Sequence, residues 1–284
     1  MSRAHAQGPV VVGVDGSDAA IHAVKWAAVE AHARKVPMKL VHVIDTENDF
    51  PFVADDLEEE EAFGRAALKT AREAVAAEDY TVDVEVELLR GRVNRAFVDL
   101  SEKASLMVAG SVGTGFFARM VLGSTALSLA QHAKCTVAVV RGADGSPVPP
   151  TSGPVIAGVD HSDSADIVVG AAMQEASIRH AELMAIHARR RRGSHEADEE
   201  ARARIDRLIA TWGAKFPSVQ VETVIAAAGP TKHLVALSAS ARAMVVGSRG
   251  LGGLEGALLG STSQSLLYHA QCPVIVARSR VVVP

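Results

Sequence analysis

The chain reads VVVGVDGSDAA at Val10–Ala20 and VIAGVDHSDSA at Val155–Ala165. Both stretches run from apolar residues into an acid, and an apolar run of this length is typical of a buried strand. The two stretches therefore predict the same strand twice, each time with an acid that points beyond the sheet. Four residues recur at a constant offset of 145: Gly13, Val14, Asp15 and Ser17 return as Gly158, Val159, Asp160 and Ser162.

Later segments repeat as well, which extends the similarity along the chain. MVAGSVG at Met107–Gly113 returns as MVVGSRG at Met244–Gly250. LGSTALSLAQHAKC at Leu122–Cys135 returns as LGSTSQSLLYHAQC at Leu259–Cys272, and both of these pairs share an offset of 137. A period of about 140 residues is too long for a solenoid repeat and indicates two copies of one domain.

The junction between the two copies is RGADGSPVPPTSGP at Arg141–Pro154, which holds four prolines and three glycines. Such a stretch continues neither a helix nor a central strand, so we expect it to be a linker. We predict a first domain at residues 1–141, a linker at 142–154 and a second domain at 155–284.

Composition restricts the class of protein. The 284 residues carry a formal net charge of −4, which disfavours nucleic acid as the main partner because phosphate binding needs a basic surface. No apolar run is long enough to span a membrane, and the stretch MSRAHAQGP at the start lacks the apolar core of a signal peptide. Two cysteines, Cys135 and Cys272, are too few for a disulfide framework and fit a reducing compartment. We therefore expect a cytoplasmic protein without membrane or nucleic-acid partners.

Short apolar runs alternate with longer amphipathic segments in both copies. This alternation predicts an α/β fold of two similar doubly wound domains, each a five-stranded parallel sheet of order 3-2-1-4-5 flanked by helices. Ser17 or Asp18 is expected to cap the first helix. The expected strands are Val10–Val14, Lys39–Ile44, Thr81–Leu89, Leu106–Ala109 and Thr136–Val140 in the first copy, and Val155–Val159, Leu183–His187, Val219–Ala226, Ala243–Val246 and Val274–Ala277 in the second.

Ligands of such sheets bind beyond the carboxyl ends of the strands, where the strand order reverses. In the order 3-2-1-4-5 the first and fourth strands are neighbours there, so Asp15 and Asp160 would face the glycine loops that follow the fourth strands. Both loops follow the spacing G-x2-G-x9-G-S, at Gly110–Ser124 and Gly247–Ser261. Successive backbone N–H groups in a glycine loop, followed by a helix N-terminus, favour a bound phosphate.

The chain resembles a tandem universal stress protein of the ATP-binding type, in both copies and over nearly its whole length. The spacing G-x2-G-x9-G-S and the segment HAQCPVIVA at His269–Ala277 carry this resemblance. It implies that the first-strand acid and the glycine loop hold ribose and phosphates, while the ends of the first and second strands enclose adenine. The binding residues implied for the first copy are Gly13, Asp15, Val43, Gly110, Ser111, Val112, Gly113, Thr114, Gly115, Phe116, Gly123, Ser124 and Thr125. Those implied for the second copy are Gly158, Asp160, Arg190, Gly247, Ser248, Arg249, Gly250, Leu251, Gly252, Gly253, Gly260, Ser261, Thr262 and Ser263.

The first copy departs from the family pattern in the middle of its glycine loop. Val112 stands where the family usually has arginine, which removes a phosphate contact. Phe116 and Phe117 stand where the family often has glycine or leucine, which would narrow or cover the pocket. The second copy is therefore expected to bind nucleotide more readily than the first.

Plainer interpretations stay open for individual residues. Each glycine loop could be a tight turn, and Asp15 and Asp160 could cap the helices that follow them, with or without a ligand. His42 and His187 are expected to be core residues, and no metal site is predicted. The arginine run Arg189–Arg192 is expected either to be a solvated loop or to reach phosphates.

The sequence supports a nucleotide site better than a reaction. Phosphoryl transfer usually needs a metal held by more than one acid, whereas each copy offers one acid at the switch point and no repeated base or nucleophile motif. No catalytic residue is therefore predicted, and at most slow ATP hydrolysis is expected. The hypothesis is a cytoplasmic ATP-binding stress-response regulator, with or without Mg²⁺, whose nucleotide controls the stability of the fold and the surface that protein partners contact.

Two alternatives stand beside this hypothesis. One is an adenine-nucleotide hydrolase or AMP-transferring enzyme, and the other is a scaffold protein that binds no nucleotide. Cyclic AMP in place of ATP is a variant of the first hypothesis. Because single domains of the family pair through their last strands, the resemblance also implies an internal pseudo-dimer through Thr136–Val140 and Val274–Ala277, and a homodimer is a further expectation.

Overall fold

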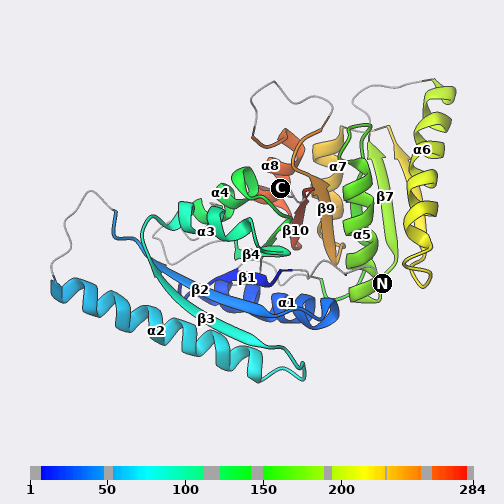
Figure 1. Ribbon diagram of the computed structural model, residues 1–284. Helices are drawn as coiled ribbons and strands as arrows, with labels where there is room; N and C mark the ends of the chain where they lie inside the picture. The colour runs from blue at the N-terminus through cyan, green and yellow to red at the C-terminus, as the bar shows by residue number, and fades with distance from the viewer. Residues whose placement is uncertain are drawn as a thin grey trace, which may run out of the picture. The chain divides into compact units, whose positions relative to one another are not determined.

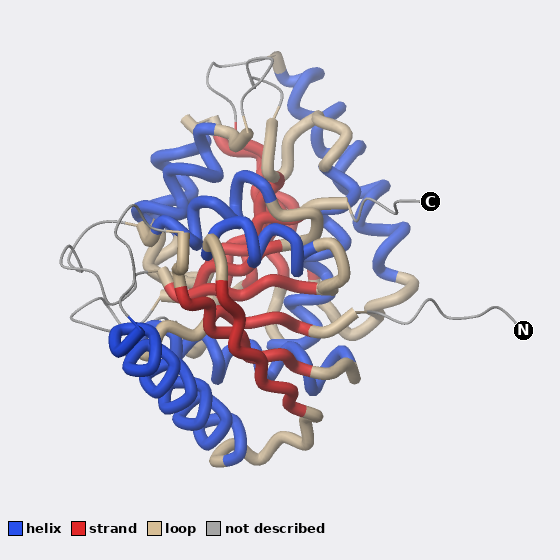
Figure 2. The backbone as a smooth tube through the Cα atoms, turned by 60° about the vertical axis from the view of Figure 1, so that its left-hand side comes forward, coloured by secondary structure: helices blue, strands red, loops and turns tan. Residues whose placement is uncertain are grey.

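The computed structural model describes residues 8–47, 54–111, 122–141, 150–188, 194–227, 229–250 and 258–279. These residues fall into two compact units, 8–141 and 150–279. Each unit is a sheet with helices packed against it (Figure 1). The backbone tube in Figure 2 shows helices on both sides of the strands.

Strands and helices alternate along the first unit. Its elements are β1 (Val10–Gly13), α1 (Asp18–Arg34), β2 (Met38–Ile44), α2 (Ala54–Ala76), β3 (Val84–Arg90), α3 (Val93–Ser101), β4 (Leu106–Gly110), α4 (Ser124–His132) and β5 (Val137–Val140). β3 begins at Val84, later than the strand that the sequence predicts from Thr81. The reason is that its neighbour β2 begins at Met38, which pairs with Val84.

The second unit repeats this alternation. Its elements are β6 (Val155–Gly158), α5 (Ala165–Arg179), β7 (Leu183–Ala188), α6 (His195–Gly213), β8 (Val221–Ala226), α7 (Pro230–Leu237), β9 (Ala243–Gly247), α8 (Ser261–His269) and β10 (Val274–Ala277). β8 likewise begins later than predicted, because Val221 pairs with Leu183, where β7 begins.

The strands of each unit form a parallel sheet. The order is β3-β2-β1-β4-β5 in the first unit and β8-β7-β6-β9-β10 in the second. Neighbouring strands pair in parallel throughout each order. This confirms the predicted fold class and the order 3-2-1-4-5. The order reverses at β1 and β4, and again at β6 and β9, so a crevice is expected beyond these strand ends.

Helices pack in pairs against the two faces of each sheet. In the first unit α1 packs against α2, and α3 packs against α4. Figure 1 shows α1 and α2 on one face of the sheet and α3 and α4 on the other. In the second unit α5 packs against α6, and α7 packs against α8. Right-handed crossovers explain this arrangement. The chain adds strands on one side of the first strand up to the third and then adds the fourth on the other side, so the later helices lie on the opposite face.

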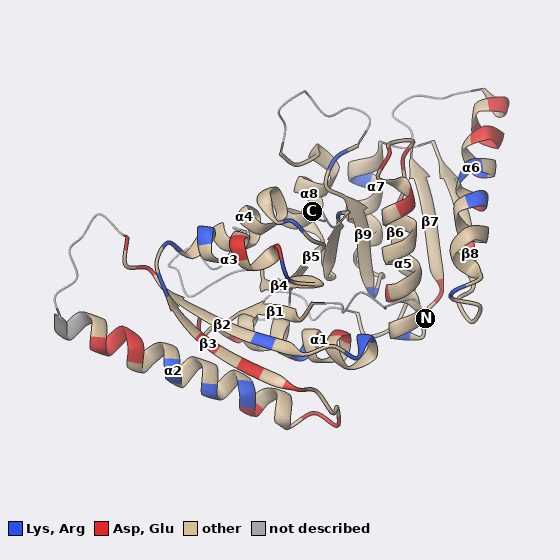
Figure 3. Cartoon of the chain, in the orientation of Figure 1, with Lys and Arg blue, Asp and Glu red and all other residues tan. Residues whose placement is uncertain are grey.

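The core is built from the central strands. β1, β4 and β5 are buried along nearly their whole length, whereas the edge strand β3 is only half-buried. Figure 3 shows the same division, because charged residues occur along α2, β3 and α6 while β1, β4 and β5 contain none. A strand that is buried on both faces reads as a continuous apolar run, which is why the sequence locates the central strands best.

A buried serine at the end of a helix is repeated in the two units. Ser101 ends α3 and Ser238 follows α7, and both are fully buried. The Ser101 hydroxyl accepts a hydrogen bond from Lys134 N at 2.9 Å, and the Ser238 hydroxyl accepts one from Gln271 N at 3.0 Å. Each hydroxyl also donates to a backbone carbonyl of its own helix, at 2.5 and 2.6 Å. Each serine thus joins a helix end to the segment that enters the last strand.

The residues just ahead of β6 are held against the second unit. The Arg242 guanidinium donates hydrogen bonds to the backbone carbonyls of Thr151 and Arg179. Gly153 has a positive φ of 104°, and a side-chain carbon on it would lie 2.2 Å from Ser240 O. Only glycine fits this position, because both the backbone conformation and the close approach exclude a side chain.

We predict that Ser238→Ala lowers the free energy of unfolding by about 1–2 kcal/mol, because Gln271 N would lose the buried Ser238 hydroxyl as its acceptor. Chemical denaturation measures this change. Ser240→Ala is the matched control, since Ser240 is exposed and follows the same helix. It should shift stability by less than about 0.5 kcal/mol. Equal effects of the two substitutions would contradict the bridging role of Ser238.

Candidate functional site

The acid after the first strand is held in the same turn in both units. Asp15 follows β1, and its Oδ1 accepts hydrogen bonds from Ser17 N at 3.0 Å and from Ser17 Oγ at 2.6 Å. Asp160 follows β6, and its Oδ1 accepts from Ser162 N at 2.9 Å and from the Ser162 hydroxyl. The serine of the repeated Asp-x-Ser pattern therefore fixes each carboxylate at the carboxyl edge of its sheet.

The helix that follows the acid starts differently in the two units. Ser17 Oγ accepts a hydrogen bond from Ala20 N at 3.1 Å, so Ser17 rather than Asp18 caps α1. In the second unit the N-cap is Ser164, which makes no side-chain cap bond. Its hydroxyl lies 2.8 Å from that of Ser162 instead. The acid turn is thus shared, while the helix start is not.

The glycine loop after β9 reaches the acid after β6. A side-chain carbon placed on Gly250 would lie 2.5 Å from Asp160 Oδ2, so the loop backbone approaches the carboxylate more closely than any other residue would allow. Ser164 Oγ donates to Arg249 O at 3.4 Å, which connects the loop to the start of α5. The acid and the loop, far apart in sequence, therefore lie side by side at the carboxyl edge of the sheet.

Beyond each glycine loop a helix presents its N-terminus. Gly123 is the N-cap of α4 and Gly260 is the N-cap of α8, and neither makes a side-chain cap bond. Gly123 N donates to Ser111 O at 2.8 Å, and Gly260 N donates to Ser248 O at 2.7 Å, which brings the end of each loop back to its beginning. The first N–H groups of a helix have no partner within the helix, so they are suited to an anion.

The hydroxyl groups on these first turns have different roles. Ser263 is buried, and its hydroxyl donates to Gly247 O at 2.5 Å, so it holds α8 to the end of β9. Thr262 Oγ1 lies 3.2 Å from Thr231 Oγ1 of α7. Ser261 is exposed, as is its counterpart Ser124 on α4. The exposed serines, with half-buried Thr125 and Thr262, are the hydroxyls that a ligand can reach.

Packing alone accounts for three of the predicted glycines. A side-chain carbon on Gly13 would lie 3.0 Å from the ring of Phe97 on α3, and one on Gly158 would lie 3.0 Å from Leu234 on α7. A side-chain carbon on Gly110 would lie 3.0 Å from the backbone of α1. These glycines let the helices approach the strand ends, whether or not a ligand binds. Val43 is largely buried on β2.

The remaining predicted site residues lie outside the described part of the chain. They are Val112, Gly113, Thr114, Gly115 and Phe116 in the first copy, and Arg190, Leu251, Gly252 and Gly253 in the second.

The histidines of the second strands are buried and hydrogen-bonded. His42 Nδ1 lies 2.7 Å from Val14 O, and His187 Nδ1 lies 2.9 Å from Val159 O. A carbonyl oxygen only accepts, so Nδ1 carries the proton in both rings. The bonds tie the second strand of each unit to the residue that precedes the acid. Within the described residues no group of three or more His, Cys, Asp or Glu could hold a metal ion.

A second ring packs edge-on against each of these histidines. The Phe63 ring of α2 lies against His42 with a centroid distance of 5.9 Å and an interplanar angle of 68°. The His161 ring lies against His187 at 4.6 Å and 62°. Sequence reasoning missed both rings. His161 directly follows Asp160 in the repeated stretch and could have been noticed, whereas the position of Phe63 follows only from the fold.

The surroundings of His161 favour its neutral form. Burial lowers the pKa of His161 below its ordinary value of 6.5, and the neighbouring His187 ring and Arg204 of α6 lower this pKa further. Asp160 and Glu200 act in the opposite direction with smaller effects. A neutral ring therefore stands beside the carboxylate near neutral pH.

Comparison with known proteins identifies the family of this chain. Residues 8–141 and 152–278 each match the universal stress protein family. The chain belongs to this family. Its two matched segments make it a tandem member, as the sequence predicted.

Several known proteins are similar to this universal stress protein. A universal stress protein of Mycobacterium tuberculosis is 38% identical over 296 residues, which cover 98% of this chain and 99% of the relative. The crystal structure of a universal stress protein from Archaeoglobus fulgidus is 22% identical, covers 95% of this chain and 98% of its own, and has a TM-score of 0.74. A universal stress protein solved in complex with cAMP is 31% identical, covers 48% of this chain and 97% of its own, and has a TM-score of 0.39. Among the described helices of this universal stress protein, none has the length and hydropathy that a membrane crossing requires.

We predict that the second unit loses stability as the pH falls through about 6.5, because the unfolded chain then takes up a proton at His161 before the folded chain does. The loss stops growing once the pH is below the pKa of the folded state. Thermal unfolding between about pH 7.5 and about pH 5.5 measures the effect. His161→Gln should reduce this pH dependence, whereas the same change at exposed His269 on α8 should keep it. An unchanged pH dependence in His161→Gln would contradict the prediction.

Proposed function

We propose that this universal stress protein is a cytoplasmic ATP-binding stress-response regulator with one nucleotide site in each domain. The proposed domains are residues 1–141 and 155–284, and the last residues of the predicted linker at 142–154 are held against the second unit. The observation that carries the proposal is the approach of Gly250 to Asp160 Oδ2, because it places a carboxylate beside a glycine loop whose backbone also adjoins Gly260, the N-cap of α8.

The chemistry of these groups matches the parts of a nucleoside triphosphate. A carboxylate accepts hydrogen bonds, so Asp160 would accept from the hydroxyls of the ribose. Backbone N–H groups donate, so the loop and the first turn of α8 would hold the phosphates, and the helix dipole favours their negative charge. Asp15 and the first turn of α4 would act in the same way in the first domain.

Binding, rather than rapid turnover, is the proposed activity. Asp160 already accepts two hydrogen bonds from Ser162, which fixes its carboxylate in place and suits the recognition of a hydroxyl. A ligand that binds only the folded chain stabilises it by mass action. The free energy of unfolding rises by about 2.7 kcal/mol when the ligand concentration is a hundredfold above Kd. The nucleotide would also cover the exposed first turns of α4 and α8, so protein partners could distinguish the loaded state from the empty state.

The first experiment is to denature the freshly purified protein by heat and to identify and count the small molecules that it releases by mass spectrometry. We expect ATP, at roughly one molecule for each working domain, and a rise in melting temperature when ATP is added back. Release of ADP or AMP instead would favour an adenine-nucleotide hydrolase. If no nucleotide is released and added ATP leaves the melting temperature unchanged, the proposal is wrong.

Gly250→Ala should weaken nucleotide binding in the second domain alone. Its side-chain carbon would enter the space of Asp160 Oδ2, so the loop and the carboxylate could no longer adjoin. We expect ATP binding in that domain to weaken at least tenfold, equivalent to about 1.4 kcal/mol, and the number of ATP molecules released for each chain to fall. Isothermal titration calorimetry measures both quantities.

Gly213→Ala is the matched control for this substitution. Gly213 ends α6, and a side-chain carbon there would contact nothing within 4 Å. It should bind ATP like the parent chain. Unchanged ATP binding in Gly250→Ala would show that the nucleotide does not depend on this contact.

A further inference from the structure

The residue directly after the first-strand acid differs between the two domains. It is His161 in the second domain and Gly16 in the first. Gly16 has a positive φ of 85°, and a side-chain carbon on it would lie 2.8 Å from Cζ of Phe63. The ring that the second domain supplies at this position is therefore supplied by α2 in the first domain.

Both rings are held by the same kind of support. Each packs edge-on against the buried histidine of the second strand, Phe63 on His42 and His161 on His187. In the first domain Gly64 allows this contact, because a side-chain carbon on it would lie 2.6 Å from the His42 ring. Two unrelated chain segments thus place an aromatic ring beside the first-strand acid.

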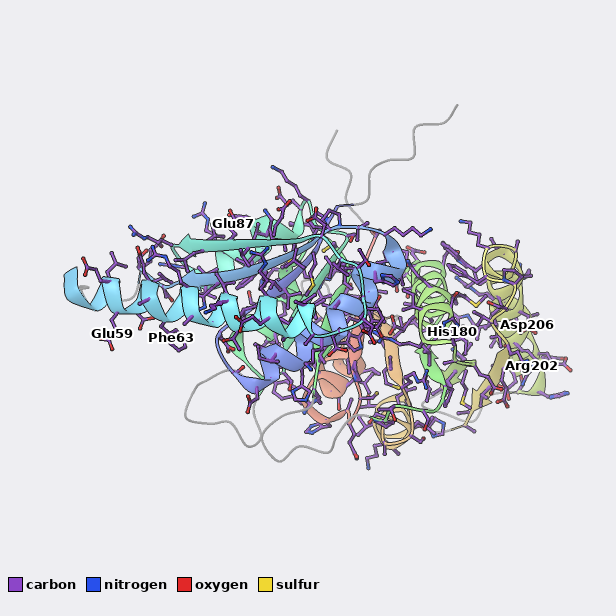
Figure 4. The ribbon with its side chains drawn as sticks, turned by 90° about the horizontal axis from the view of Figure 1, so that it is seen from below. Glu59, Phe63, Glu87, His180, Arg202 and Asp206 are labelled. Atoms are coloured by element: carbon purple, nitrogen blue, oxygen red, sulfur yellow. The ribbon has the colours of Figure 1, made fainter. Side chains whose placement is uncertain are left out.

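Phe63 keeps much of its surface in contact with solvent. Its side chain is 48% exposed, although residues further along α2, such as Leu68 and Ala71, are buried. Figure 4 shows Phe63 on the side of α2 that faces away from Glu87 of β3. His161 is also only partly buried. An exposed ring at the carboxyl edge of the sheet offers an apolar face where the predicted crevice opens.

We propose that Phe63 and His161 are the residues against which the base of the bound nucleotide stacks, each in its own domain. This proposal rests on the proposed function, because it assigns the base position of the same two sites. Aromatic rings attract nucleobases through their flat faces, and the effect tolerates different bases. Phe63 would contribute stacking alone. His161 would contribute stacking and a ring nitrogen that can form a hydrogen bond.

The test for the first domain uses a chain whose second site is disabled by Gly250→Ala. In that chain, Phe63→Leu should weaken ATP binding about 5- to 150-fold, because leucine keeps apolar packing on His42 but has no flat face. Binding of inorganic tripolyphosphate, which has no base, should be unchanged. Phe63→Tyr should bind ATP like the parent. Isothermal titration calorimetry with both ligands measures these affinities.

Tyr80→Leu is the control for this pair. Tyr80 is another exposed ring of the first domain that packs on a histidine, His32, with a centroid distance of 5.3 Å. It lies just before β3, away from the carboxyl edge of the sheet, so its loss should leave ATP binding unchanged. A second readout is Phe63→Trp, whose indole fluorescence should be quenched by ATP and not by tripolyphosphate.

The second domain is tested in a chain whose first site is disabled by Asp15→Ala. His161→Phe keeps the flat face and should lose less ATP affinity than His161→Leu, which should weaken ATP binding by a similar factor to Phe63→Leu while tripolyphosphate binding stays the same. Leucine variants that bind ATP as tightly as their parents would overturn the stacking role and leave the proposed function intact. Equal losses for ATP and tripolyphosphate would also overturn it, because the rings would then only support the fold. If the parent chains bind no ATP at all, both proposals are wrong.

Discussion

The first strand of each domain pairs with a parallel neighbour on both sides, and the rest of the site depends on this double pairing. Val10 pairs with Met38 on one side and with Leu106 on the other, and Val155 does the same with Leu183 and Ala243. The chain leaves these neighbours toward opposite faces of the sheet, so a space opens between the departing segments. The acid directly follows the first strand, so it lies at this space.

The two domains keep this framework and differ in what surrounds it. The acid turn, the buried histidine and the buried serine are repeated with closely similar hydrogen bonds. The helix start and the ring beside the acid are not repeated, since Ser17 caps α1 while Ser164 leaves α5 without a side-chain cap. The hydrogen bonds that hold the strands to the backbone are thus the same in both domains, whereas the side chains beside the acid differ.

Much of the fold follows from the sequence alone, since central strands read as continuous apolar runs and the repeat shows every element twice. The sequence predicts β3 from Thr81 because the alternation of valine with polar residues already starts at Val82, and only the pairing of Val84 with Met38 sets where the strand begins. The approach of Gly250 to Asp160 could be expected from the strand order. The contact between Phe63 and Gly16 could not, because it depends on how closely α2 packs against β2 and on no local sequence pattern.

The hydrogen bonds of Arg242 place the start of the second domain ahead of its first strand, β6. Because Arg242 holds the carbonyl of Thr151 and Gly153 is packed against Ser240, the residues ahead of β6 belong energetically to the domain that follows them. A protease must draw its substrate out into an extended strand, and here that would require breaking these hydrogen bonds and backbone contacts. A stable fragment of the second domain therefore carries the segment from Thr151 onward, and one that starts at Val155 leaves the Arg242 guanidinium without one of its acceptors.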